Sequence, residues 1–274
     1  MKRISIFLYG AVSYLIFLAV FLYAVGFIGN FAVPKSLDSP GSGSLQTAVL
    51  IDVGLLTLFA LQHSIMARPA FKRFITRFIP ASAERSTYVL ASSLALALLF
   101  WNWQPLGGTV WNVEHPVARN LLYAGYAFGW ALVLITTFVI NHFDLFGLRQ
   151  VWRQLQGRPQ ARLHFVTPLL YRIVRHPLYV GWFFAFWSTP VMTITHLFFA
   201  VMTTAYILVA IRFEEADLLK EHPQYAMYRR QVPMLVPRLT RNTSLPRTDL
   251  VAPSAGGSRN QDSARAVLAN SESR

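Results

Sequence analysis

The sequence contains no cysteine among its 274 residues, and charged residues are scarce. Without a thiol, the chain cannot form a disulfide, a thiolate metal site or an iron–sulfur cluster, and it has no cysteine nucleophile. Charged residues make up 14% of the chain, compared with about 25% in a typical soluble domain, whereas hydrophobic residues make up 54%. This balance indicates that lipid is the main solvent of the protein.

Acidic residues are the scarcer of the two charge types. The chain has 12 Asp and Glu against 25 Lys and Arg, which gives a formal net charge of +13. The basic residues lie between apolar runs, where they orient membrane helices and bind anionic lipid headgroups. We therefore expect the lipid bilayer, and not nucleic acid, as the large partner of this chain.

Long apolar runs predict the fold class. Four of them have the length of roughly 20 residues that a helix needs to cross a bilayer. They cover residues 4–29, 45–66, 86–103 and 120–140. A fifth run, residues 178–211, is too long for one crossing, and Pro190 interrupts it. The sequence predicts an all-α integral membrane protein with five to six transmembrane helices, the last two forming a proline-broken helical hairpin.

The distribution of basic residues predicts the orientation of these helices. Loops 67–85 and 141–177 are rich in Lys and Arg, whereas loops 30–44 and 104–118 are poor in them. By the positive-inside rule, the basic loops and both termini face the cytosol, and the chain is a multi-pass protein of a bacterial inner membrane.

Arg175, His176 and Pro177 stand at the predicted start of the hairpin. Proline favours the first turn of a helix, and a helix start beside Arg and His is electropositive. The acidic segment 212–217 lies at the end of the return helix, so a hairpin brings it close to this start. The pair suits a zwitterion with a positive centre, such as S-adenosylmethionine, but an exposed structural salt bridge would look the same.

Other polar residues lie in or beside the predicted spans. Asp52 is interpreted as a structural acid near the outer face. His63, at the cytosolic end of the same span, is either an ordinary interfacial residue or part of the site. The polar and aromatic loop 141–150 is interpreted equally as a capped helix end or as the wall of a substrate pocket.

Several separated motifs follow one another in the last third of the chain. They are residues 171–182, Glu214 and Glu215, Tyr225, Tyr228, and Val232 with Pro233. In order and spacing they resemble the isoprenylcysteine carboxyl methyltransferase superfamily over about residues 160–237. The resemblance implies a small membrane enzyme that binds S-adenosylmethionine in a small cytosolic cap, at the ends of its last helices.

The resemblance also implies cofactor-binding positions. They are Tyr171, His176, Pro177, Leu178, Tyr179 and Glu214, with His164, Phe165 and Val166 in a segment along the cofactor. The helix-start argument adds Arg175. The arginine that the superfamily uses for a prenylcysteine carboxylate falls at Ala210, with Arg212 the nearest replacement, which argues against a prenylated protein substrate.

Segments 62–68, 84–88 and 141–150 resemble the methanethiol S-methyltransferase branch of this superfamily. This resemblance implies methyl transfer to methanethiol with release of dimethyl sulfide. A thiol with a pKa of about 8.5 or higher is mostly protonated at neutral pH, so the enzyme must bind the thiolate or remove a proton. The candidate residues are His63, Glu84, His142, Asp144 and Arg149; no metal-ligand motif is evident.

On this reading the chain divides into three parts. Residues 1–140 form the N-terminal transmembrane helices, and residues 141–237 form the catalytic region with its loop, hairpin and cap. Residues 238–274 are rich in Ser, Arg and Asn and lack apolar periodicity, which predicts a disordered tail.

Other functions stay open at this stage. NnrU-type membrane proteins, which include a haem-dependent isomerase, share the segment around His63, which would then bind haem with a second histidine. Another small or lipidic molecule could accept the methyl group. A membrane adaptor would use the basic tail but has no need of the motifs at 171–182 and 214–233.

Overall fold

The computed structural model describes residues 2–41, 43–160, 169–222 and 224–238. The predicted cofactor contacts His164, Phe165 and Val166 and the predicted tail from residue 239 onward lie outside these residues. The helices are α1 (Lys2–Gly29), α2 (Leu45–Ala67), α3 (Pro69–Ile75), α4 (Glu84–Asn102), α5 (Pro116–Ile140), α6 (His142–Leu145), α7 (Leu148–Leu155), α8 (Pro177–Trp187), α9 (Ile194–Glu221) and α10 (Tyr225–Gln231). The described chain also contains the 3-10 helices η1 (Ala81–Ala83) and η2 (Leu169–Arg172) and the short strands β1 (Thr109–Asn112) and β2 (Val191–Thr193).

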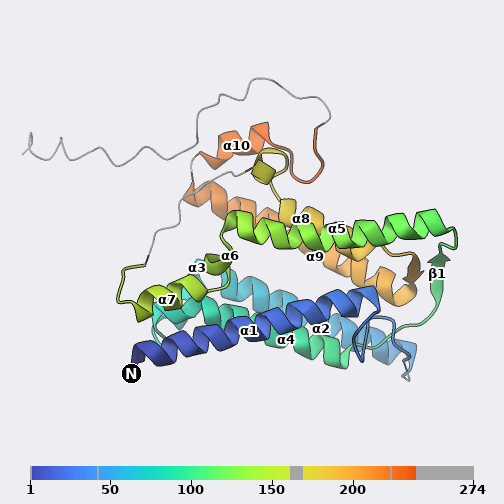
Figure 1. Cartoon of the computed structure of the whole chain (residues 1–274), viewed down its shortest axis with the longest axis horizontal. Helices are drawn as coiled ribbons and strands as arrows, with labels where there is room; N and C mark the ends of the chain where they lie inside the picture. The colour runs from blue at the N-terminus through green and yellow to red at the C-terminus, as the bar shows by residue number, and fades with distance from the viewer. Residues whose placement is uncertain (1, 42, 161–168, 223, 239–274) are drawn as a thin grey trace, which may run out of the picture.

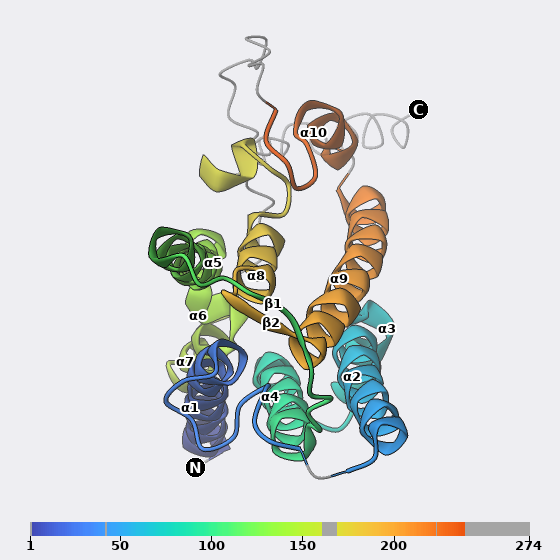
Figure 2. The same cartoon turned by 90° about the vertical axis from the view of Figure 1, so that its right-hand side faces the viewer.

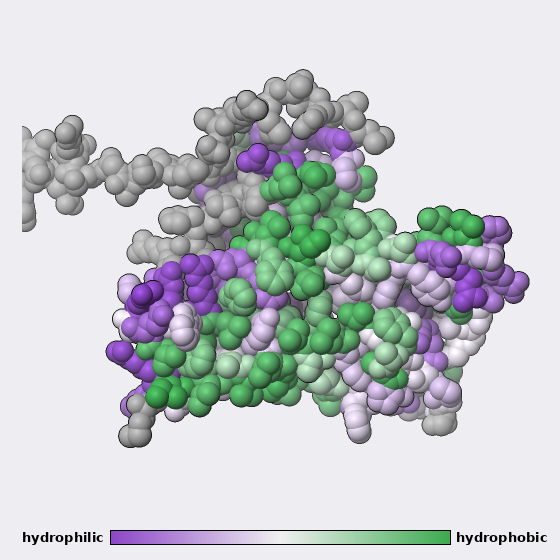
Figure 3. Space-filling view, viewed as in Figure 1, coloured by the Kyte–Doolittle hydropathy of each residue, from purple (hydrophilic) through white to green (hydrophobic). Residues whose placement is uncertain are grey.

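Four helices of the described chain are long and apolar enough to cross a membrane: α1, α2, α5 and α9. Apolar side chains cover most of the middle of the face shown in Figure 3, and hydrophilic ones gather toward its two ends. Helices thus make up most of the structure, and the prediction of a helical, multi-pass membrane protein is confirmed at this level.

The helices lie in two rows. Figure 2 shows α1, α4 and α2 in one row, with α5, α8 and α9 beside it. The two strands pair antiparallel at one end of the molecule, and Figure 1 shows this end opposite the N-terminus. We call it the ribbon end, and the opposite end the site end. Apolar side chains such as Phe27, Leu99 and Phe199 fill the space between the rows.

The predicted break near Pro190 is confirmed. Helix α8 ends at Trp187, strand β2 follows, and α9 begins at Ile194. The side-chain oxygen of Thr193 accepts a hydrogen bond from the His196 N–H at 2.9 Å and so caps α9. The two arms are unequal, with 11 residues in α8 and 28 in α9. Part of the first arm is thus replaced by the strand that pairs with β1.

Candidate active site

The segment before α8 is held by the chain that follows α10. The N–H groups of Arg175 and His176 donate to the carbonyls of Pro233 at 2.9 Å and Met234 at 3.2 Å. Pro177 occupies the first turn of α8, where its missing N–H costs no hydrogen bond. These contacts place Arg175 and His176 between the starting end of α8 and the final turns of α9.

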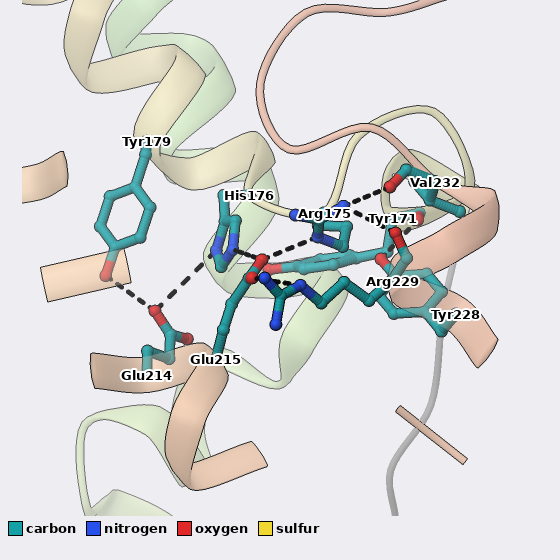
Figure 4. A network of polar contacts seen from close by, with 9 residues as sticks. All are labelled: Tyr171, Arg175, His176, Tyr179, Glu214, Glu215, Tyr228, Arg229 and Val232. Atoms are coloured by element: carbon teal, nitrogen blue, oxygen red, sulfur yellow. Dashed lines mark hydrogen bonds and ion pairs between the residues drawn. The ribbon is translucent and has the colours of Figure 1, made fainter. Parts of the chain in front are cut away.

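Glu215 is the centre of a buried ionic group at this position (Figure 4). Its Oε1 lies 2.7 Å from Arg175 Nε and 3.1 Å from His176 Nε2, and its Oε2 lies 3.2 Å from Arg229 Nε. Arg175 Nη1 also donates to the carbonyls of Arg229 at 3.0 Å and Val232 at 2.5 Å. This group joins α8, α9 and α10. It also directs the guanidinium of Arg175 inward, and the role of Arg175 in cofactor binding stays a prediction.

Glu214, the preceding residue, has the opposite exposure. Its side chain is 48% exposed, whereas that of Glu215 is 7% exposed. Glu214 Oε2 accepts a hydrogen bond from the Tyr179 hydroxyl at 3.0 Å and lies 3.9 Å from His176 Nδ1. Because the Glu215 carboxylate can only accept, His176 Nε2 carries a proton, and Nδ1 is the atom directed toward Glu214. Glu214 is thus an accessible carboxylate beside a hydroxyl and an imidazole.

Two tyrosines close the side of this group near α10. The Tyr228 hydroxyl donates to the Tyr171 carbonyl at 2.6 Å, which ties α10 to η2. Burial raises the pKa of the Tyr171 hydroxyl, and the negative charge of Glu214 raises it further. Burial likewise raises the pKa of Tyr228. Both side chains are therefore neutral hydroxyls at pH 7, and Tyr171 lies within electrostatic range of Glu214.

The structure therefore brings together Tyr171, His176, Tyr179 and Glu214, which were predicted to bind the cofactor. Pro177 is buried and Leu178 is half-buried in the first turn of α8. Arg212, the nearest replacement for the superfamily arginine, is exposed on α9.

A second polar group comes from the N-terminal helices. The Tyr88 hydroxyl lies 2.8 Å from His63 Nε2 and 3.1 Å from Nδ1, and Ser92 Oγ lies 3.2 Å from Nδ1. Ser64, next to His63, lies 3.1 Å from the Tyr206 hydroxyl of α9. The hydroxyl of Tyr88 is within electrostatic range of both Tyr206 and Glu214. This group therefore extends toward the cofactor-side residues.

His142 lies elsewhere, between α1 and α5. Its Nε2 lies 2.9 Å from the Tyr14 hydroxyl, and its Nδ1 lies 2.8 Å from Thr137 Oγ1. The ring stacks on Phe138 with a centroid distance of 4.3 Å and is buried. Burial lowers the pKa of His142 and so favours the neutral ring. Both nitrogens have partners within the protein.

The remaining acceptor-side candidates lie around the start of α4. Asp144 is buried and pairs with Arg149 at 3.0 Å. Arg85 donates from Nε to the Leu145 carbonyl at 2.8 Å, and its guanidinium lies 5.2 Å from the centre of the Tyr88 ring. Glu84, in the first turn of α4, is half-buried and within electrostatic range of Tyr88. Arg85 thus connects the loop of Asp144 with the His63 group.

Sequence reasoning missed three residues of this region: Glu215 as the ionic centre, Tyr88 as the partner of His63, and Tyr206. One signal was available for Tyr206. It stands two helical turns before Glu214 in an otherwise apolar stretch of α9, so both residues lie on one face of the helix. Tyr88 lies in segment 84–88, which carries part of the resemblance, but no pattern in the sequence assigned it a role.

Known proteins resemble this chain over most of its length. It is 58% identical over 238 residues to a methanethiol S-methyltransferase of Crocosphaera subtropica, covering 86% of this chain and 93% of the relative. The chain belongs to the methanethiol S-methyltransferase family. A methanethiol S-methyltransferase of Mycobacterium tuberculosis is 51% identical over 244 residues, covering 89% of this chain and all of the relative.

The family has more distant relatives. Nurim of Xenopus laevis is 30% identical over 183 residues, which is 63% of this chain and 63% of Nurim. No protein-family model and no solved structure matches the chain. The predicted resemblance to the methanethiol S-methyltransferase branch is thereby confirmed.

Proposed function

We propose that this protein transfers the methyl group of S-adenosylmethionine to methanethiol and releases dimethyl sulfide. The observation that carries the proposal is the 58% identity, over 86% of the chain, to a relative named methanethiol S-methyltransferase. That name supports the reaction and the acceptor. The group around Glu214 supports the methyl donor.

The residues around Glu214 fit S-adenosylmethionine, which carries an ammonium and a sulfonium. A half-exposed carboxylate pairs with an ammonium through charge-assisted hydrogen bonds, and His176 Nδ1 can accept a further one. The aromatic rings of Tyr171 and Tyr179 attract a cation at their faces. When bound, S-adenosylmethionine supplies an electrophilic methyl group on a positively charged sulfur.

The chain's own contribution is to bind both reactants side by side, which can supply much of the acceleration. Further proposed contacts of the donor are Arg175, Pro177, Leu178 and residues 164–166. His63, Glu84, His142, Asp144 and Arg149 are the proposed candidates on the acceptor side.

We further propose that the site end faces the cytosol, together with both termini, because loops 67–85 and 141–160 at this end are rich in Lys and Arg. In this arrangement α4 and the α8–α9 hairpin bring the number of crossings to five or six. Helices η2 and α10 belong to the cofactor-binding cap of the catalytic region, residues 141–237.

A headspace assay tests the proposed function. Membranes that contain the protein, given methanethiol and S-adenosylmethionine, should release dimethyl sulfide. Omission of either reactant, and membranes from cells that lack the protein, are the controls. If dimethyl sulfide does not rise above the level of the empty membranes, the proposed function is wrong.

A further inference from the structure

The candidate residues for the acceptor differ in where their partners lie in the fold. His142 has a partner on each ring nitrogen and an aromatic ring stacked on its face. Asp144 is buried in a pair with Arg149. The partners of these two residues lie on α1, α5 and α7. His63 also has hydroxyl partners, Tyr88 and Ser92, but Tyr88 lies within electrostatic range of Glu214 and Tyr179.

The surroundings of His63 are suited to sulfur. Phe59 stacks on the imidazole with a centroid distance of 5.3 Å, and the Tyr88 ring lies 5.1 Å away on another side. Thioethers and thiols make favourable contacts with aromatic rings. The Tyr88 hydroxyl can turn from the imidazole to donate to a thiolate, as hydroxyls do for anions that form in other active sites. The guanidinium of Arg85, 5.2 Å from the Tyr88 ring centre, adds a positive charge.

This group also lies beside the proposed donor site. Tyr88 and Tyr206 are both within electrostatic range of Tyr179, whose hydroxyl binds Glu214. The hydrogen bond between Ser64, next to His63, and Tyr206 holds α2 against α9 near these tyrosines. A thiol at His63 would thus lie on the N-terminal side of the site, opposite the residues proposed to bind S-adenosylmethionine.

We infer that His63 and Tyr88 form the acceptor-thiol site, in which His63 takes the proton of methanethiol and Tyr88 holds the resulting thiolate. This inference rests on the proposed function. The S–H bond breaks, its electron pair stays on sulfur, and the proton moves to the imidazole, which then releases it to water. Tyr88 is a residue of the acceptor site that the sequence did not single out.

The pH dependence of His63→Gln separates proton removal from a structural role. At pH 7 we expect kcat/KM for methanethiol to fall by about 100-fold, the usual effect of losing a general base. Activity should then rise about tenfold per pH unit between about pH 6 and pH 8, because only thiolate formed in solution reacts when the thiol pKa is about 8.5 or higher. The wild type should vary less steeply over this range.

Tyr88→Phe tests the thiolate-binding role and keeps the aromatic ring. We expect KM for methanethiol to rise about tenfold, the effect of losing one hydrogen bond to a charged group, with a smaller change in kcat. Tyr9→Phe is the matched control. The Tyr9 hydroxyl, on α1, donates a hydrogen bond at 2.9 Å to Thr87, which neighbours Tyr88 on α4 but lies on the exposed side. It should leave both constants unchanged.

Equilibrium binding of radiolabelled S-adenosylhomocysteine to the purified variants provides a readout that does not depend on turnover. Both site variants should bind it as the wild type does, which shows that the fold and the donor side are intact. A wild-type pH profile in His63→Gln, or an unchanged KM in Tyr88→Phe, would overturn the inference while leaving the proposed function standing. A wild type that makes no dimethyl sulfide would overturn both.

Discussion

Glu214 and Glu215 are neighbours in sequence and differ in almost every physical respect. Successive side chains on a helix point about 100° apart, so one faces the Arg175 side of α9 and the other faces the open side. Glu215 is enclosed by Arg175, His176 and Arg229, and removal of one partner from such a buried group is strongly destabilising. Glu214 keeps an accessible carboxylate. Glu215 holds the site together, and Glu214 is available to a ligand.

A substitution at Glu214 should therefore affect the donor and spare the fold. For Glu214→Gln we expect KM for S-adenosylmethionine to rise at least about tenfold, because a hydrogen bond to a charged group contributes about 1.5–3 kcal/mol. KM for methanethiol should stay unchanged. Initial rates at varied concentrations of each reactant measure both constants.

Glu114→Gln is the control for this change, because Glu114 is an exposed glutamate near the ribbon end, far from Glu214 in the fold. Equal effects of the two substitutions, or an effect of Glu214→Gln on methanethiol alone, would argue that Glu214 does not contact the donor.

At the scale of elements, the contact between α5 and α8 decides where the site begins. A Cβ added at Gly129 would lie 2.5 Å from the Ala185 nitrogen and 2.7 Å from the Gly181 carbonyl oxygen. Gly181 and Ala185 on α8 meet Gly129 on α5, and Gly125 meets Ser188 at the end of α8. Both helices thus carry the small-xxx-small spacing that lets membrane helices approach closely. The close approach of α5 and α8 fixes the position of Pro177 at the start of α8, and therefore the position of His176 relative to α9.

Two alanine substitutions should change stability in opposite directions. Gly129→Ala should lower the free energy of unfolding by about 1–3 kcal/mol, because the new methyl group meets backbone atoms that cannot move cheaply. Gly54→Ala, where a Cβ would meet nothing within 4 Å, should raise it by up to about 1 kcal/mol through helix propensity. Denaturant unfolding in detergent micelles measures both. A neutral Gly129→Ala would contradict the close packing of α5 and α8.

At the scale of the whole molecule, the two ends carry different polar groups. The site end has the basic loops and the groups of Glu214 and His63. At the ribbon end, Asp38 accepts hydrogen bonds from Asn30 at 2.7 Å and from Thr193, and lies 3.8 Å from His196 Nδ1. Burial would raise the pKa of Asp38, but its interactions with His196, Thr193 and Asn30 outweigh burial and lower it. This group ties loop 30–44 to the turn of the hairpin.

The proposed orientation can be tested with cysteine labels, because the chain has no cysteine of its own. Gly43 and Arg77 are both exposed and lie beyond opposite ends of α2, whose 23 residues span about 35 Å. Gly43→Cys should react with a membrane-impermeant maleimide from the periplasm, and Arg77→Cys should react only after the inner membrane is opened. Labelling of Arg77→Cys behind an intact inner membrane would reverse the orientation.

Patterns along the chain predicted the long helices and the residues that the hairpin brings together. Apolar runs of bilayer length predicted α1, α2, α4 and α5, and Pro190 predicted the hairpin, because helix formation and its interruption depend on residues within a few turns. The motif of residues 171–182 with Glu214 pointed to the end of the hairpin, since a hairpin must bring its two ends together.

Only the tertiary structure shows which of several similar residues lies beside the residues proposed to bind the donor. Nothing near His63 or His142 in sequence distinguishes them. Both rings have two hydroxyl partners, but those of His142 lie on α1 and α5, whereas His63 contacts Tyr88, which is within electrostatic range of Glu214. Likewise, the partner of Ser64 lies 142 residues away in sequence, at Tyr206. Such pairs depend on how helices pack across the molecule, and packing is set by the shapes of whole surfaces, which no local periodicity encodes.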